Sequence, residues 1–168
     1  IIRLKVKGHS GHKITMKPGE LLEKDSTVNQ RASGGPYLWN YTLSGKGVEE
    51  WQPQFTYYGF RYVEVSDIEK IELIELAGMH TTNSAPEAGS FSCSLPMFNK
   101  IYELIDWSIR SNLASILTDC PHREKLGWLE VAHLMQHAMQ YRYQLDGLYS
   151  KVMGDIKDSQ TQEGIVPS

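Results

Sequence analysis

Apolar and polar residues alternate along most of the first half of the chain, and the period of the pattern changes near residue 80. Alternation is typical of strands that bury one face, as in antiparallel sheets. Clusters of Gly, Pro and Asn separate the alternating segments, as expected for turns. The segments that we predict to be strands are residues 1–7, 13–17, 37–43, 55–65 and 70–76.

The predicted strand at residues 55–65 carries a run of aromatic residues, and two interpretations of this run are open. The first is packing of the sheet, which we favour because aromatic side chains are common in strands. The second is a platform on which sugar rings stack. Gly59 within the run indicates either a bulge or a close approach of another backbone segment. The aromatic residues are Tyr57, Tyr58, Phe60 and Tyr62.

After a linker rich in Ser and Thr, the apolar residues recur every three or four positions, which is the spacing of an amphipathic helix. Ser94 is placed to cap the first helix, and Pro96 is tolerated in a first turn. Strands followed by helices predict an α+β chain in segregated units rather than a βαβ sheet. The positions that define the three helical patterns are Phe98, Ile101, Ile105, Ile109 and Leu113, then Ala132, Met135, Gln136, Met139 and Tyr143, then Leu148, Val152 and Ile156.

Composition narrows the classes of partner. The 168 residues are 40% hydrophobic, enough for one core or two small ones, and the net charge of −3 offers no basic field for nucleic acid. No run approaches the ~18 apolar residues of a membrane span, so no membrane partner is expected.

The chain opens inside a strand-like pattern without Met, and we expect it to be a fragment. Cys93 and Cys120 are most simply free thiols, although pairing between them stays open.

The segment TDCPHREKLGWLE, residues 118–130, brings carboxylates, basic groups, a thiol and an imidazole together in a short stretch of chain. Pro121 predicts that a helix starts there, which gives Asp119 a possible structural role as its cap. The alternative is a functional site, and the residue pattern alone does not decide between the two. For Glu124 the corresponding alternatives are a surface ion pair with a basic neighbour and a catalytic carboxylate. Trp128 favours the interpretation of Glu124 as a catalytic carboxylate, because a large aromatic ring tends to cover the groups next to it.

Two carboxylates together with an arginine and a tryptophan suit the hydrolysis of glycosides. One carboxylic acid would protonate the leaving oxygen, while the tryptophan packs on an apolar patch of the sugar. Asp119 and Glu124 are five residues apart, and on a helix such positions diverge by roughly 140°. Their convergence therefore requires a turn.

Other site chemistries have weaker support. His133 and His137 have the spacing of helical zinc ligands, but the Glu of HExxH and a third ligand are missing, so we expect no metal. Cys120 and His122 flank a proline and are unsuited to a thiol nucleophile. The turn SGKG at residues 44–47 lacks the spacing of a phosphate loop, and we expect no cofactor.

The motif TDCPHREKLGW resembles the signature TDCPxRxERxGWxGD of bacterial α-L-rhamnosidases, glycoside hydrolase family seventy-eight. Three further segments resemble the same family, so that the resemblance covers essentially the whole chain. They are WQPQFTYYGFRYVEV, GSFSCSLPMFNKIYELIDWSIRSNLASIL and LYSKVMGDIKDSQTQEGIVPS. The resemblance implies part of a β-sandwich domain at residues 1–78, a linker at 79–91 and the start of a catalytic α/α barrel at 92–168. An incomplete barrel would leave the apolar faces around Ile105, Met139 and Val152 without partners.

The resemblance also implies roles for four residues. Glu124 matches the family's proposed general acid, Asp119 and Arg123 match residues that bind rhamnose hydroxyls, and Trp128 matches an aromatic residue near the sugar's methyl group. The implied activity is inverting hydrolysis of terminal α-L-rhamnosyl groups from plant polysaccharides or glycosides. Inversion needs a second carboxylate roughly 6.5–9.5 Å from the acid, which we expect beyond Ser168.

One position departs from the family signature. Val131 stands where the signature has Asp, and Glu130, one residue away, would be turned by about 100° on a helix. A non-catalytic sugar-binding or degenerate homologue is therefore the alternative function. A periplasmic or secreted location is slightly favoured over a cytoplasmic one, and the sequence gives no prediction of oligomeric state.

Overall fold

The computed structural model describes residues 1–166 and divides into two compact units, each described here by itself. The first unit comprises residues 1–81 together with 121–124, and the second comprises 82–120 and the chain from Lys125 onwards. Pro167 and Ser168, which end the predicted barrel segment, lie outside the described residues.

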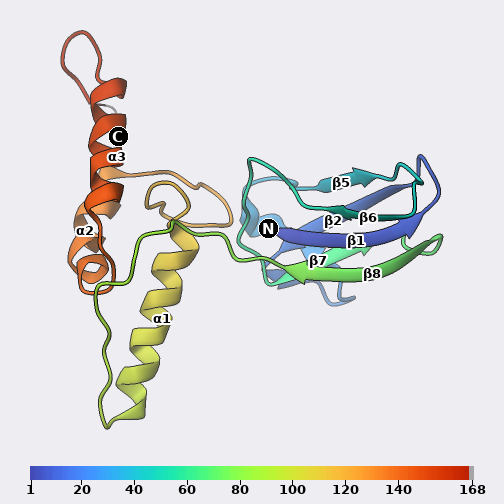
Figure 1. Ribbon diagram of the computed structural model, residues 1–168, viewed down its shortest axis with the longest axis horizontal. Helices are drawn as coiled ribbons and strands as arrows, with labels where there is room; N and C mark the ends of the chain where they lie inside the picture. Colours follow the sequence, from blue (N-terminus) through green and yellow to red (C-terminus); the bar gives the residue numbers. More distant parts are fainter. Residues whose placement is uncertain (167–168) are drawn as a thin grey trace. The chain divides into compact units, whose positions relative to one another are not determined.

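The first unit consists of antiparallel sheets (Figure 1). One three-stranded sheet has the order β6-β1-β8, a second has the order β5-β2-β7, and β3 and β4 form a short hairpin. The strands are β1 (Ile2–Gly8), β2 (Lys13–Gly19), β3 (Leu21–Leu22), β4 (Val28–Asn29), β5 (Trp39–Thr42), β6 (Val48–Trp51), β7 (Tyr62–Ser66) and β8 (Ile71–Gly78).

The core of the first unit joins the central strands of the two larger sheets. Alternate residues of β1 and β2 are buried, as the alternation in the sequence predicts. Each such aliphatic side chain contributes about 1.5–3 kcal/mol when it is fully removed from water. The buried cluster consists of Ile2, Leu4, Val6, Ile14, Met16 and Leu43.

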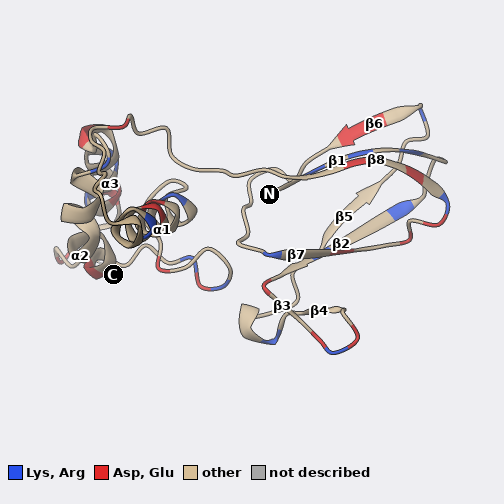
Figure 2. Cartoon of the chain, turned by 90° about the horizontal axis from the view of Figure 1, so that it is seen from below, with Lys and Arg blue, Asp and Glu red and all other residues tan. Residues whose placement is uncertain are grey.

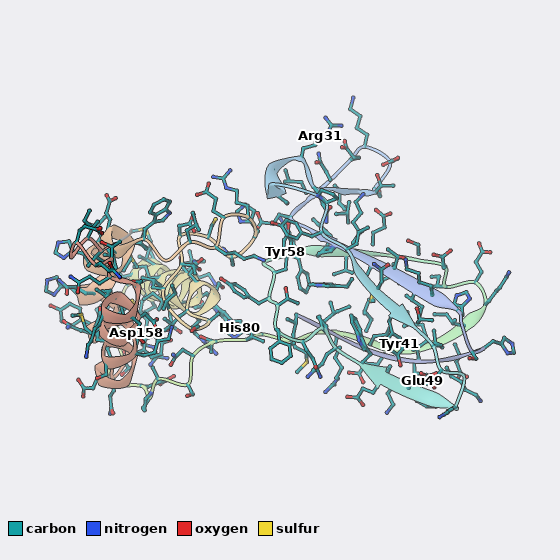
Figure 3. The ribbon with its side chains drawn as sticks, turned by 90° about the horizontal axis from the view of Figure 1, so that it is seen from above. Arg31, Tyr41, Glu49, Tyr58, His80 and Asp158 are labelled. Carbon is teal, nitrogen blue, oxygen red and sulfur yellow. The ribbon has the colours of Figure 1, made fainter. Side chains whose placement is uncertain are left out.

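A carboxylate connects the edges of the two larger sheets. Glu49 on β6 accepts hydrogen bonds from the backbone N–H of Ser44 (2.9 Å), the hydroxyl of Tyr41 on β5 (2.8 Å) and the N–H of Gly45 (3.0 Å). Figure 3 shows Tyr41 and Glu49 on these two strands. The hydrogen bonds, that from Ser44 above all, lower the pKa of Glu49 to about 2 although burial acts in the opposite direction. Glu49 thus fixes the turn between β5 and β6.

The predicted strand at residues 55–65 is only partly correct, because the strand begins at Tyr62. Phe55 is fully exposed and has a φ of 56°, which ends the extended conformation there. The packing interpretation of the aromatic run holds for Tyr58, which is buried, and for Phe60, which packs against the core. The sequence prediction missed β6, since its four residues are too short to show a period.

The second unit contains three helices with one buried cluster. Their bounds are α1 (Pro96–Asn112), α2 (Leu129–Gln140) and α3 (Asp146–Ser159). The cluster consists of Ile109, Leu113, Leu117, Met139, Tyr143, Leu145 and Leu148. Met139 is only 1% exposed and Val152 packs against the cluster, so the expectation that their faces lack partners was wrong, whereas Ile105 is 44% exposed as expected.

Two predicted helix starts need correction. Leu95, not Ser94, is the N-cap of α1, and the Asn99 side chain binds the backbone N–H and C=O of Cys93 just before it. The second helix begins at Leu129 rather than at Pro121, because residues 121–124 form a turn. The order of sheets first and helices second is confirmed. It is consistent with a β-domain followed by the beginning of a helical barrel.

An ion network ties the segment before α1 to the helices of the second unit. Arg142 donates to Asp106 (3.0 Å), to Glu87 (2.6 Å) and to the carbonyl of Gly89 (3.0 Å), while the Tyr143 hydroxyl also donates to Asp106. Burial acts to raise the pKa of Asp106, but the hydrogen bonds from Tyr143 and Arg142 lower it overall. Burial and the Asp106 contact raise the pKa of Tyr143 to about 12. No helix within residues 1–166 is long and apolar enough to cross a membrane.

Candidate functional site

The motif forms a closed loop that precedes α2. The backbone N–H of Asp119 donates to the carbonyl of Leu126 (3.0 Å), and a carboxylate oxygen of Asp119 accepts from the Leu126 N–H (2.8 Å). The thiol of Cys120 donates to the other carboxylate oxygen (3.3 Å). Asp119 therefore closes the motif loop and does not cap α2, which corrects its predicted structural role.

The tip of the loop, residues 121–124, belongs to the first unit. The N–H of Gly59 donates to the carbonyl of Pro121 (2.8 Å), and a Cβ at Gly59 would lie 2.8 Å from Pro121 Cγ. His122 Nε2 lies 3.8 Å from a carboxylate oxygen of Glu20. Of the two interpretations of Gly59, close backbone approach is confirmed. The sheet unit thus holds the segment that carries the proposed acid.

Glu124 and Arg123 are neighbours in space as well as in sequence. Arg123 Nε lies 3.7 Å from Glu124 Oε1, and the two side chains are 52% and 49% exposed. Such an exposed pair contributes little stability, because water screens it. Both side chains also line a pocket of about 490 Å³ whose remaining wall comes from residues 31–37 of the first unit. Glu124 is therefore accessible to a ligand.

The residue that follows Glu124 has an unusual backbone. Lys125 has a φ of 56°, in the left-handed region that side chains with a Cβ rarely adopt. Burial lowers the pKa of its ammonium group. A conformation of this kind costs of order 1–3 kcal/mol and persists only where the surroundings fix it, as they often do at functional sites.

Gly127 and Trp128 end the loop. A Cβ at Gly127 would lie 2.0 Å from Ile116 Cδ1, so a larger residue here would displace the Ile116 side chain after α1. Trp128 is the N-cap residue of α2 and is 37% exposed, which leaves much of its ring available for contact.

The structure distributes the four predicted site residues over both units. Arg123 and Glu124 lie together in the first unit, whereas Asp119 and Trp128 belong to the second. Val131 packs partly buried against the helical core, and Glu130 is exposed in the first turn of α2. An apolar side chain at position 131 thus serves packing.

The histidines and cysteines considered in the sequence lie in ordinary structural surroundings. His133 and His137 are exposed on α2, and residues 1–166 contain no group of three or more side chains suited to hold a metal. Cys93 and Cys120 are both free thiols, as the sequence analysis favoured.

Sequence reasoning missed the residues that complete the pocket beside Glu124. Arg31 lies on the 3-10 turn η1 (Arg31–Ser33), Gly34 follows it, and Tyr37 precedes β5. They lie roughly 90 residues before Glu124 in the chain, and no local pattern marks them. The Gly34-Gly35-Pro36 triplet indicates only that the chain turns there.

Comparison with known proteins covers nearly the whole chain. Residues 1–82 match the bacterial alpha-L-rhamnosidase concanavalin-like domain, and residues 86–168 match the bacterial alpha-L-rhamnosidase 6 hairpin glycosidase domain. An alpha-L-rhamnosidase of Streptomyces avermitilis is 34% identical over 97% of this chain, and one of Formosa agariphila is 37% identical over 75% of it. The chain spans 16% and 13% of these relatives.

Solved structures give the same result. The alpha-L-rhamnosidase of Dictyoglumus thermophilum superposes with a TM-score of 0.80 at 35% identity, covering 98% of this chain and 19% of that one. The Streptomyces avermitilis alpha-L-rhamnosidase complexed with L-rhamnose gives 0.77 at 30% identity, covering 99% and 17%. At identities of 30% and 35%, these structures share the family of this chain as well as its fold.

Proposed function

The chain belongs to the bacterial α-L-rhamnosidase family, and from this premise we propose that it is part of a longer enzyme, called the parent below, that hydrolyses α-L-rhamnosides. The observation that carries the proposal is the match of both family domains at once, over residues 1–82 and 86–168. The proposed substrates carry terminal α-L-rhamnosyl groups, as in plant polysaccharides and glycosides.

In this proposal Glu124 is the general acid. It is half-exposed, lines a pocket and stands beside a guanidinium, so a ligand can reach it without rearrangement of the core. Protonation of the glycosidic oxygen lets the leaving group depart as a neutral alcohol. Arg123 and Asp119 would bind hydroxyl groups of rhamnose, and Trp128 would pack on its apolar side.

The proposed reaction inverts the anomeric carbon. An inverting enzyme needs a second carboxylate that takes a proton from water on the opposite face of the ring. We place this base outside the 168 residues, in the part of the parent that the chain does not span. No step of this scheme requires a metal or a cofactor.

The alternative is a protein that binds rhamnosides without cleaving them. Val131 favours it, because its side chain packs in the core where the family signature has an acidic residue. We favour hydrolysis, since Asp119 and Arg123 keep the spacing of the signature, as do Glu124 and Trp128. The chain is one residue shorter than the signature between Arg123 and Glu124.

The test is Glu124→Gln in the parent. We expect kcat on a rhamnoside with a poor leaving group to fall roughly 10²–10⁴-fold, the usual contribution of general acid catalysis, while rhamnose affinity stays nearly intact. Glu103→Gln is the matched control, because Glu103 is similarly exposed (54%) and also pairs with a basic neighbour, Lys100. Unchanged turnover in Glu124→Gln would exclude this residue as the acid. A parent that binds rhamnose but cleaves no rhamnoside would support the alternative.

A further inference from the structure

The pocket beside Glu124 has one wall that the proposed catalytic roles do not use. Its volume is about 490 Å³, and the wall comes from residues 31–37 of the sheet unit. Figure 2 shows that the β3–β4 hairpin projects from the sheet that contains β7, and η1 follows β4 directly in the chain. The residues of the wall are Arg31, Ala32, Gly34 and Tyr37.

The wall is held in a fixed conformation. The Gln30 side-chain amide donates to the carbonyls of Tyr37 (2.8 Å) and Pro18 (2.6 Å), and its oxygen accepts from the Tyr37 N–H (3.1 Å). The Tyr37 ring packs on the buried ring of Tyr58, with centroids 4.7 Å apart. Tyr37 is therefore positioned before any ligand arrives, which lowers the entropy lost on binding.

The wall and the acid-bearing segment are in direct contact. Gly34 has a φ of 80°, and a Cβ there would lie 3.6 Å from the Cβ of Arg123. Gly59 binds the carbonyl of Pro121 on the same segment. The spacing between the wall and Glu124 is thus set within one compact unit.

Arg31 supplies a polar group that can change partners. Its side chain is 83% exposed and pairs with Glu23 at 2.9 Å. An exposed pair of this kind contributes little, so replacement of Glu23 by a ligand oxygen costs little. Figure 3 shows Arg31 on the projecting η1 turn.

We propose that this pocket binds the leaving group of the rhamnoside, and that the leaving group it fits is itself a sugar. The inference rests on the proposed function, because it takes Glu124 as the acid. A general acid must reach the oxygen that joins rhamnose to the leaving group, so surfaces next to the acid face that group. A pocket lined by both an aromatic ring and a guanidinium suits a sugar, whose C–H face packs on the ring and whose hydroxyls accept from the guanidinium.

The test compares two substrates of the parent that differ only in the leaving group. A disaccharide of rhamnose and glucose would fill the pocket, whereas α-L-rhamnosyl fluoride has a one-atom leaving group that cannot. In Tyr37→Ala and in Arg31→Ala we expect the ratio of kcat/KM for the disaccharide to that for the fluoride to fall about tenfold, mainly through KM. Arg61→Ala is the control, because Arg61 belongs to the same unit but contacts Tyr62 instead of the pocket.

The outcomes separate the two proposals. A parent of wild-type sequence that cleaves neither substrate refutes the proposed function. A parent that cleaves both, with ratios in the Tyr37 and Arg31 variants equal to wild type, refutes only the leaving-group pocket. An equal loss on both substrates also refutes it, since that is the result expected of a purely structural role. A fall in the ratio that is absent from Arg61→Ala supports it.

Discussion

At the scale of single residues, the neighbours of Glu124 on both sides determine its position in the loop. Arg123 precedes it at ion-pair distance, and Lys125 follows it with a left-handed backbone that turns the chain away. The carbonyl of Pro121, three residues earlier, is bound by Gly59. The hydrogen bond from Gly59 holds the backbone that leads to this exposed carboxylate. A carboxylate so placed can act on a ligand without the loss of order that a free surface side chain would bring.

Gly59→Ala tests whether this backbone support matters. The added Cβ would lie 2.8 Å from Pro121 Cγ and 3.3 Å from its carbonyl carbon, both in a rigid residue, so the segment must move. We expect a stability loss of about 1–3 kcal/mol and a clear fall in kcat of the parent, measured by chemical unfolding and by turnover. Gly78→Ala is the control, because a Cβ there meets nothing within 4 Å. Equal effects in both variants would show that the Gly59 contact has no special role.

Trp128→Ala tests the proposed contact with the sugar. Removal of the ring should weaken binding of rhamnose to the parent by about 1–3 kcal/mol, through lost apolar contact. Titration calorimetry with rhamnose measures this directly. Trp107→Ala is a suitable comparison, because Trp107 is 45% exposed on α1 and packs against Arg110 instead. Isotherms of Trp128→Ala that coincide with wild type would assign the ring to structure alone.

At the scale of elements, regular periods were predictable and irregular segments were not. The three helices follow from apolar residues at three- and four-residue steps, and β1 and β2 from strict alternation. The start of α2 was misplaced because Pro121 carries a helix-start signal, yet the Asp119–Leu126 hydrogen bonds close residues 119–126 into a loop, and the helix begins only at Leu129. Local sequence signals do not report such contacts.

The residues of the candidate site also fall into those that the sequence could identify and those that it could not. Asp119, Arg123, Glu124 and Trp128 could be named because they share one short motif. Arg31 and Tyr37 could not, because their proximity to Glu124 arises from packing between segments far apart in the chain. Tertiary proximity without a local pattern is visible only in the folded structure.

Asp106→Asn tests the ion network that connects α1 to the residues after α2. The side chains of Asp106 and Arg142 are only 12% and 13% exposed, so removal of the negative charge leaves a largely buried guanidinium poorly compensated. We expect the free energy of unfolding of the parent to fall by about 2–3 kcal/mol, as measured by urea unfolding. Glu87→Gln removes the network's exposed partner (67%) and should cost less than about 1 kcal/mol. Similar losses in the two variants would contradict this account.

At the scale of the whole molecule, the 168 residues span less than a fifth of the relatives to which they are similar. One face of α1 carries several apolar side chains that are largely exposed among residues 1–166, and apolar surface of this kind drives association. The exposed apolar residues of this face are Met97, Phe98, Ile101, Leu104 and Ile105. In the parent we expect further helices to cover this face.

The last prediction concerns residues 1–168 produced alone. The exposed face of α1 should make the isolated chain self-associate, which light scattering or gel filtration would detect as particles larger than its 19.1 kDa. Catalysis should be absent for a separate reason, because Glu124 is present but the proposed water-activating carboxylate lies elsewhere in the parent, and inversion needs both. We therefore expect no release of rhamnose from an aryl rhamnoside by the isolated chain, alongside measurable release by the parent. Turnover by a monomeric sample would place the base within these residues, with Asp119 and Glu130 as the first candidates.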